Sequence, residues 1–291
     1  MFWTKKPAVP ISLTPLPRRP LGQTGQEVTL FGLGGEGVLR THGRNAAAVR
    51  VIQRALDHGV NYCDTAPAYA GSMDYYGAAL GERRGQVFLA SKTHDRTRDG
   101  SLRLLDDSLR RLRTDYLDLW QLHDLRTQHD LDRIFAKGGA LEALLQARAE
   151  GRVRFLGLTG HHDPAILVEG MRRLTFDTVL VALNAADVHR MSFIHTVVAE
   201  AARRGMGVIG MKVCVQGRLV GRNRLSMEEA MGYVLSLPGV SLVIVGCQTP
   251  EEVDANARIA REFCVLDEAR LRELEERTRL QADAFTYYKK V

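Results

Sequence analysis

Short apolar runs alternate with amphipathic stretches along almost the whole chain, and this alternation limits the fold more than any other feature. Eight runs of strand length lie at residues 30–35, 60–65, 87–92, 116–123, 153–159, 178–184, 207–213 and 241–247. They are mostly continuous in apolar residues, which is typical of parallel strands buried on both faces. We therefore expect a sheet whose two faces are covered by other parts of the chain.

The stretches between these runs have helical spacing. In residues 46–58, the side chains of Val49, Ile52 and Leu56 fall on one helical face, and Gly59 ends the helix. Further helices are expected over residues 101–113, 139–150, 163–173, 192–204, 226–236 and 250–260. Eight strands that alternate with helices within about 240 residues predict an α/β fold, a (β/α)8 TIM barrel.

Smaller elements are expected at the two ends. Residues 21–29 contain two glycines between short apolar ends, which indicates a hairpin before the barrel. Residues 266–279 predict an extra C-terminal helix. Residues 1–19 are rich in proline and basic residues and are expected to form a flexible basic arm. We see no linker or repeat inside residues 20–291, which are expected to form one barrel domain.

The composition narrows the function classes. Its 45% hydrophobic and 25% charged residues are ordinary for a globular protein. We find no apolar run of ~18 residues and no signal-peptide core, so no membrane partner is expected. The net charge of +6 comes from arginines spread along helical faces, which favours a solvated surface over a nucleic-acid platform. Attraction for phosphate-bearing ligands is the alternative interpretation.

The four cysteines form no C-x-x-C pair, which argues against a zinc site, an iron–sulfur site or a disulfide framework. We therefore expect a cytoplasmic protein without a metal site.

Residues 32–37 match the G-x-G-x-x-G pattern of dinucleotide-binding Rossmann domains. The surrounding residues do not fit that fold, because residues 41–45 interrupt the helix that should begin among the glycines. Asp64 also lies too far along the chain to be the acidic residue that ends the second strand of such a unit. We interpret the glycines as a strand-to-loop passage where a ligand or backbone segment must come close.

Three ionisable residues end neighbouring strands of the predicted barrel. Asp64, Lys92 and His123 end the second, third and fourth apolar runs, and Tyr69 lies in the loop after the second. All strand C-termini of a barrel gather at the face that carries the active site, and neighbouring strands lie ~5 Å apart. Each residue alone has a structural explanation, such as a cap or a buried histidine. Their joint placement favours a catalytic site.

The residue types indicate a reaction that protonates an oxygen. A buried ammonium at Lys92 is expected to lower the pKa of Tyr69 and make its phenol a general acid. The Asp64 carboxylate would keep that lysine charged, and the His123 imidazole can donate to a carbonyl oxygen. We see no nucleophile–base pair and no metal-ligand spacing. Hydride addition to a carbonyl fits, with the hydride supplied by a cofactor.

With these residues in view, the sequence resembles the aldo-keto reductase family from about Leu21 to Asn256. The resemblance rests on residues 21–25 (LGQTG), 64–69 (DTAPAY), 91–92 (SK), 115–119 (DYLDL) and 122–124 (LHD). It implies a (β/α)8 barrel that reduces an aldehyde or ketone, or oxidises the alcohol, with NADP(H). It also implies that Tyr69 is the general acid/base, that Lys92 and Asp64 tune it, and that His123 positions the carbonyl.

The resemblance is weaker in the cofactor half. It assigns cofactor contacts to Thr159, Gly160, Asn184, Met211, Lys212, Gly246, Gln248, Glu252 and Asn256. Residues 159–161 (TGH) replace a usual Ser-Asn, Leu180 replaces a usual glutamine, and residues 211–212 (MK) replace a stacking aromatic. These variants resemble an outlying bacterial branch, some members of which append an iron–sulfur tail whose cysteines this chain lacks. The usual 2′-phosphate cations are also missing beside Glu252, so NAD(H) is an alternative cofactor.

Two other function classes stay open at this stage. Weak nicotinamide contacts would suit a cofactor-sensing or regulatory protein on the same barrel, and Lys92 could instead form a Schiff base in an aldolase or isomerase. For the reductase, the expected partner is a small carbonyl or alcohol substrate, and the expected state is a monomer or weak homo-oligomer. Residues 124–138 hint at a pocket with polar and aromatic sides.

Overall fold

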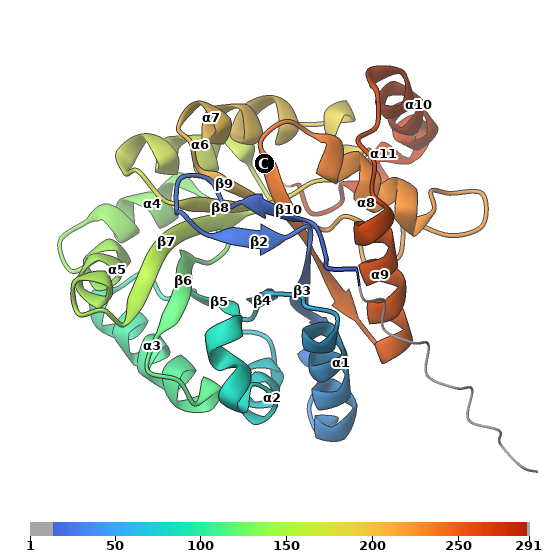
Figure 1. The fold of residues 1–291 in the computed structure, drawn as a ribbon. Coiled ribbons are helices and arrows are strands. Elements are labelled where there is room, and N and C mark those ends of the chain that lie inside the picture. The colour runs from blue at the N-terminus through green and yellow to red at the C-terminus, as the bar shows by residue number, and fades with distance from the viewer. Residues whose placement is uncertain (1–13, 290–291) are drawn as a thin grey trace, which may run out of the picture.

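The computed structural model describes residues 14–289. Eight strands close into a barrel in the order β10-β3-β4-β5-β6-β7-β8-β9, and all neighbouring pairs are parallel (Figure 1). Their bounds are β3 Phe31–Gly37, β4 Tyr62–Asp64, β5 Phe88–Thr93, β6 Leu117–Leu122, β7 Val153–Gly160, β8 Thr178–Ala182, β9 Gly207–Met211 and β10 Val240–Cys247. The predicted (β/α)8 barrel is confirmed, and a Rossmann fold is excluded.

Helices surround the barrel (Figure 1). They are α1 Asn45–Asp57, α2 Ser72–Ala79, α3 Arg98–Leu112, α4 Gln128–Phe135, α5 Ala140–Ala149, α6 Pro164–Arg173, α7 Ala199–Arg203, α8 Met227–Ser236, α9 Pro250–Glu262, α10 Glu268–Thr278 and α11 Ala282–Phe285. The segment 192–204, expected to be one helix, contains a π-helical turn, Ile194–Val198, before α7. Within residues 14–289, no helix has the length and apolar character that crossing a membrane requires.

Three helices, α2, α4 and the short C-terminal α11, were not predicted from the sequence. Helix α2 has little amphipathic spacing, because most of its residues are buried. Helix α4 lies inside the segment 124–138 and is fixed by a capping box, in which Thr127 and Asp130 satisfy each other's backbone N–H groups. Phe135, the last residue of α4, packs against the core, and its ring lies beside Arg173.

Apolar side chains fill the part of the barrel nearer the N-terminal ends of the strands. The fully or nearly fully buried residues of this cluster are Leu21, Val28, Tyr62, Phe88, Ala90, Leu119, Leu180, Ile209 and Leu242. Tyr62 stacks on Phe88 and Phe88 stacks on Phe155, with ring centroids 5.5 and 6.0 Å apart. Nearer the C-terminal ends of the strands, the inward positions become polar, beginning with Asp64 and Lys92. The barrel is therefore a packed core that becomes polar at the C-terminal ends of its strands.

The expected N-terminal hairpin is present and lies across one end of the barrel (Figure 1). Strands β1 (Arg18–Pro20) and β2 (Glu27–Thr29) pair antiparallel, with the two glycines in the turn between them. The first 13 residues of the predicted arm lie outside the described ones. Its last residues are not an arm, because Arg18 and Arg19 belong to β1.

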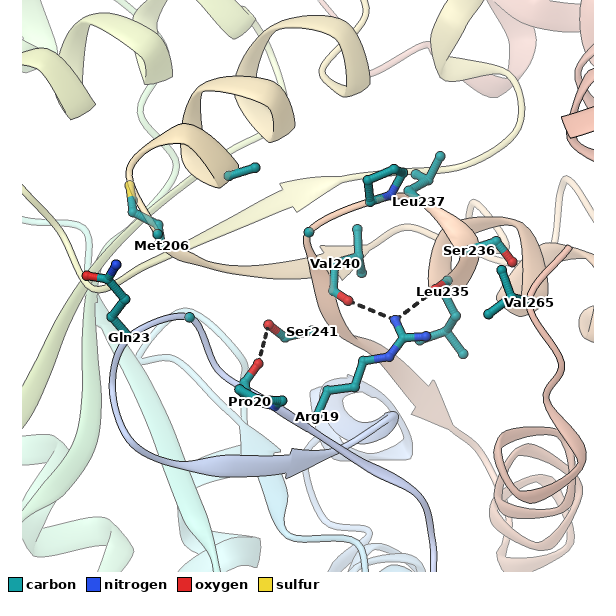
Figure 2. Close-up of a pocket in the computed structure, with 15 residues that line it drawn as sticks. Arg19, Pro20, Gln23, Met206, Leu235, Ser236, Leu237, Val240, Ser241 and Val265 are labelled. Atoms are coloured by element: carbon teal, nitrogen blue, oxygen red, sulfur yellow. Dashed lines mark hydrogen bonds between the residues drawn. The ribbon is translucent and has the colours of Figure 1, made fainter. Parts of the chain in front are cut away.

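Arg19 attaches the hairpin to the barrel, as Figure 2 shows. Its guanidinium donates to the carbonyl oxygens of Leu235 at 2.8 Å and Val240 at 2.9 Å. The Ser241 hydroxyl donates to the Pro20 carbonyl at 2.9 Å. The pocket drawn in Figure 2 is lined partly by residues at or beside the N-terminal ends of β9 and β10. It therefore lies at the opposite end from Asp64 and Lys92, where barrels carry stability rather than catalysis.

Candidate active site

Asp64 and Lys92 form a buried ion pair at the C-terminal ends of neighbouring strands. Asp64 is the last residue of β4, and its Cα is paired with that of Ala90 in β5, two residues before Lys92. Side chains alternate along a strand, so Lys92 points to the same inner face as Ala90. Lys92 Nζ lies 2.5 Å from Asp64 Oδ1 and 2.9 Å from the Thr65 carbonyl oxygen. The two side chains are 0% and 1% exposed.

Burial and pairing act in opposite directions on these two groups. Burial raises the pKa of Asp64, while Lys92 and the amide of Gln121 lower it. Burial likewise lowers the pKa of Lys92, and Asp64 raises it. Removing either partner would leave an uncompensated charge in the barrel, so the pair acts as one unit.

Tyr69 lies in the loop between β4 and α2. Its backbone N–H donates to the Ala66 carbonyl at 3.0 Å, and its own carbonyl accepts from Ser72, the first residue of α2. A Cβ atom on Gly35 would lie 2.5 Å from the Tyr69 ring. The glycine-rich passage at residues 32–37 therefore gives Tyr69 the space it occupies.

Two cations approach the Tyr69 ring, and an imidazole lies at its side. Lys92 Nζ lies 4.8 Å from the ring centroid and the Arg40 guanidinium carbon 5.2 Å from it. The rings of Tyr69 and His123 meet edge to face, 5.7 Å apart at 84°. The structure therefore gathers all four residues that the sequence analysis singled out.

The expected lowering of the pKa of Tyr69 is wrong. The pKa of Tyr69 is well above its ordinary value, chiefly because of burial and next because of the negative charges of Asp64 and Glu36. Arg40 opposes this shift. The strand positions could be predicted from the sequence. The burial of the Tyr69 phenol and the proximity of Glu36 on β3 could not. The arrangement keeps Tyr69 in its protonated form.

His123 follows β6 directly. Its backbone N–H donates to the Thr93 carbonyl at 2.8 Å, and its own carbonyl accepts from Arg96 at 2.9 Å. Burial and the neighbouring positive charge of Lys92 hold the pKa of His123 well below its ordinary value. The imidazole is therefore neutral near pH 7 and carries one N–H that can donate to a ligand oxygen.

The expected nicotinamide contacts lie at the ends of β7, β8 and β9. Thr159 and Gly160 end β7, and Met211 ends β9, followed by Lys212. Asn184 is buried two residues beyond β8. These are amide, hydroxyl and ammonium groups on strand ends, and such a donor set fits a carboxamide or phosphate-bearing ligand.

Asn184 is already engaged by the C-terminal segment of the chain. Its Nδ2 donates to the hydroxyl of Tyr288 at 2.9 Å. The ring of Tyr288 also lies 5.4 Å from Lys212 Nζ and 5.9 Å from the ring of His161. An aromatic ring thus lies beside Lys212 after all, although it comes from the far end of the chain.

Lys289 secures this segment. Its Nζ lies 2.5 Å from Asp187 Oδ1 and 2.6 Å from the carbonyl oxygen of Arg190, and both charged side chains are fully buried. The sequence analysis missed Tyr288 and Lys289, because they lie in the stretch interpreted as a tail. An aromatic pair followed by lysines at residues 287–290 was the available signal.

The expected adenosine contacts lie around the start of α9. The Thr249 hydroxyl caps the helix, and the Glu252 carboxylate accepts from the Gln248 backbone N–H at 2.7 Å. Asn256 is buried and donates to the Cys247 sulfur at 3.4 Å. Gly246 lies against β3, where a Cβ atom would meet the Glu36 backbone at 2.7 Å. The negative charge of Glu252 therefore lies where a helix N-terminus would otherwise favour an anionic ligand.

Chemically, the four gathered residues suit proton donation to an oxygen. The protonated phenol of Tyr69 lies beside the neutral imidazole of His123. Lys92, which is paired with Asp64, lies close to the Tyr69 ring. Lys92 is engaged by Asp64 and Thr65, which disfavours a Schiff base with a carbonyl substrate.

Known proteins give the same picture of the chain. Residues 31–231 match the Aldo/keto reductase family, which is more than half of the sequence. The oxidoreductase YqkF of Bacillus subtilis is 26% identical over 58% of this chain and 57% of its own length. The L-galactose dehydrogenase of Arabidopsis thaliana is 30% identical over 51% of this chain and 50% of its own length. The chain thus spans about half the length of these two relatives.

Solved structures agree on the fold. An aldo-keto reductase from Bacillus halodurans in its holo form superposes with a TM-score of 0.76, at 22% identity. The match covers 95% of this chain and 98% of that one. The barrel with its added elements is therefore shared by proteins whose sequences have diverged widely.

Proposed function

The chain belongs to the aldo/keto reductase family, and on that premise we propose that it reduces an aldehyde or ketone to an alcohol, or catalyses the reverse oxidation. The observation that carries this proposal is the edge-to-face contact of Tyr69 with His123, together with the buried, Asp64-paired Lys92 beside the Tyr69 ring. A reduced nicotinamide supplies the hydride when it is bound.

The chain's own residues would orient the carbonyl oxygen of the substrate and transfer the proton. His123 donates its N–H to the carbonyl oxygen and orients it. As negative charge develops on that oxygen, the Tyr69 phenol gives up its proton to complete the alcohol. The phenolate left behind lies beside the cations of Lys92 and Arg40, which stabilise it until it is protonated again. In alcohol oxidation the phenolate takes the proton.

The N-terminus of α9 favours NAD(H) over NADP(H). Glu252 places a carboxylate there, and its charge opposes a 2′-phosphate. Fluorescence titration with NADH and NADPH side by side tests this preference. Glu252→Gln keeps a hydrogen-bond acceptor but removes the charge. We expect it to improve NADPH binding relative to NADH by about 3–10-fold, about what ~1 kcal/mol of surface electrostatics supplies. An unchanged ratio would exclude this role for Glu252.

Replacing Tyr69 by phenylalanine tests the reaction itself. We expect turnover over a panel of carbonyl compounds to fall by about 10²–10⁴-fold, because the general acid is lost, while the Kd of the cofactor changes little. Tyr116→Phe is the matched control, since Tyr116 stacks with Arg84 before β6 begins and should leave turnover unchanged. If Tyr69→Phe kept full turnover, the assignment of the acid would be wrong.

A further inference from the structure

Three side chains with metal-binding atoms meet beside the candidate active site. Asp124 lies two residues beyond β6, and His161 and His162 follow β7 directly. Strands β6 and β7 are neighbours, and Leu122 is paired with Leu158, so the two loops leave the barrel at the same level. One ligand atom from each residue lies within 4.8 Å of the others.

Their spacing is close to that of ligands on one ion. His161 Nδ1 lies 3.2 Å from Asp124 Oδ1, and His162 Nε2 lies 3.6 Å from Asp124 Oδ2. Two ligand atoms that each lie ~2.05 Å from a tetrahedral zinc ion are about 3.3 Å apart. One ligand atom from each of the three residues lies within 4.8 Å of the other two, so an ion would draw them closer together. Two histidines and a carboxylate are also the protein ligands of several zinc sites that keep an open coordination position.

Metal binding also requires access from solvent. The three side chains are 13–20% exposed, so an ion can reach them from solvent. Arg126 donates to Asp124 Oδ2 at 2.7 Å from a side chain that is 59% exposed, so an ion would compete with it for that oxygen. Asp124 Oδ1 faces His161.

We propose that Asp124, His161 and His162 bind one divalent transition-metal ion of the Zn²⁺ type beside the candidate active site. The sequence analysis expected no metal site, since the cysteines form no pair and no metal-ligand spacing is present. Two adjacent histidines and a carboxylate from another loop form no such spacing. Asp124 also contributes to the raised pKa of Tyr69. A bound dication would offset the negative charge of Asp124, so metal binding would change the acidity of Tyr69.

Binding can be measured without reference to catalysis. The full chain, free of any polyhistidine tag, is titrated with Co²⁺ while its visible d–d absorption is followed, and with Zn²⁺ in competition with a chromogenic chelator. We expect one ion per chain. Asp124→Asn and His162→Gln should each weaken binding by ~10-fold or more, since each removes a ligand. His129→Gln, an exposed histidine on α4, should change nothing.

Circular dichroism checks that each variant is folded, and if Asp124→Asn fails, His162→Gln decides alone. The proposal is overturned if the wild-type chain binds neither ion, or if a folded ligand variant binds as tightly as the wild type. Loss of binding in Cys264→Ser would also overturn it, because it would place the ion at the exposed Cys264 thiol instead.

Discussion

Tyr69 shows how closely the candidate site depends on the absence of a single side chain. Its ring fills the space that a Cβ atom on Gly35 would need, and the same atom would lie 2.9 Å from the Asp64 carbonyl oxygen. The glycine on β3 and the loop after β4 are therefore fitted to each other. The position of the phenol follows from this contact as much as from its own loop.

Gly35→Ala should therefore lower turnover by about 100-fold without unfolding the barrel, because a displacement of the acid by ~1 Å disrupts its alignment with the carbonyl. Steady-state kinetics measures this loss. Gly85→Ala is the control, since a Cβ atom there meets nothing within 4 Å. Equal turnover in the two variants would show that the Gly35 contact does not position Tyr69.

The hydroxyl of Tyr288 is expected to compete with a bound cofactor. Asn184 donates to its hydroxyl, and a cofactor amide held by Asn184 would have to replace that partner. Tyr288→Phe should tighten cofactor binding by about 2–10-fold, the value of one neutral hydrogen bond. Tyr287→Phe loses a comparable bond to Gln216 and should leave the Kd unchanged. Weaker binding in Tyr288→Phe would show that the hydroxyl helps the cofactor.

Among the elements, helices α1 and α9 are joined by one carboxylate. Asp254 on α9 accepts from Arg54 at 2.5 and 3.0 Å and lies 2.6 Å from the imidazole of His58, just beyond α1. Burial alone would raise the pKa of Asp254, but the hydrogen bonds from Arg54 and His58 hold it below its ordinary value. The folded state therefore favours the charged form.

Asp254→Asn should lower the free energy of unfolding at pH 7 by about 1–3 kcal/mol. A carboxylate with a lowered pKa stabilises the fold above its unfolded pKa near 4, and this contribution is lost as the pH falls through the folded value. Urea unfolding from pH 7 down to 3 should therefore show the variant and the wild type converging. A difference that stayed constant with pH would show that the charge of Asp254 is not the cause.

The elements also show what the sequence could and could not predict. The eight strands were found because both of their faces are buried, so their apolar runs are continuous. Helix α2 was missed because its buried residues leave no polar face, and α4 because its signal lies in one capping box. Asp64, Lys92 and His123 could be placed because strand ends converge. The contacts of Tyr288 and the meeting of Asp124 with two histidines depend on loop paths that no local pattern encodes.

At the scale of the whole molecule, one end of the barrel contributes to stability and the other carries the candidate active site. The hairpin closes the N-terminal end through Arg19, and the ionisable groups gather at the C-terminal end. Arg19→Ala should lower the free energy of unfolding by about 1–3 kcal/mol, because two hydrogen bonds from a charged group are lost. Arg18→Ala removes an exposed side chain and is the control for thermal unfolding. A fall in turnover of the folded Arg19→Ala protein would show that the two ends are coupled.

The proposed reductase chemistry can be followed atom by atom. NADH or NADPH carrying deuterium at both C4 positions is incubated with the full chain and an activated aldehyde such as 4-nitrobenzaldehyde, and the alcohol is analysed by mass spectrometry. We predict one deuterium on the former carbonyl carbon with the wild-type protein, and at least ~100-fold less labelled alcohol with Tyr69→Phe. Saturating cofactor binding without any labelled alcohol would contradict the proposal and point to a cofactor-sensing protein.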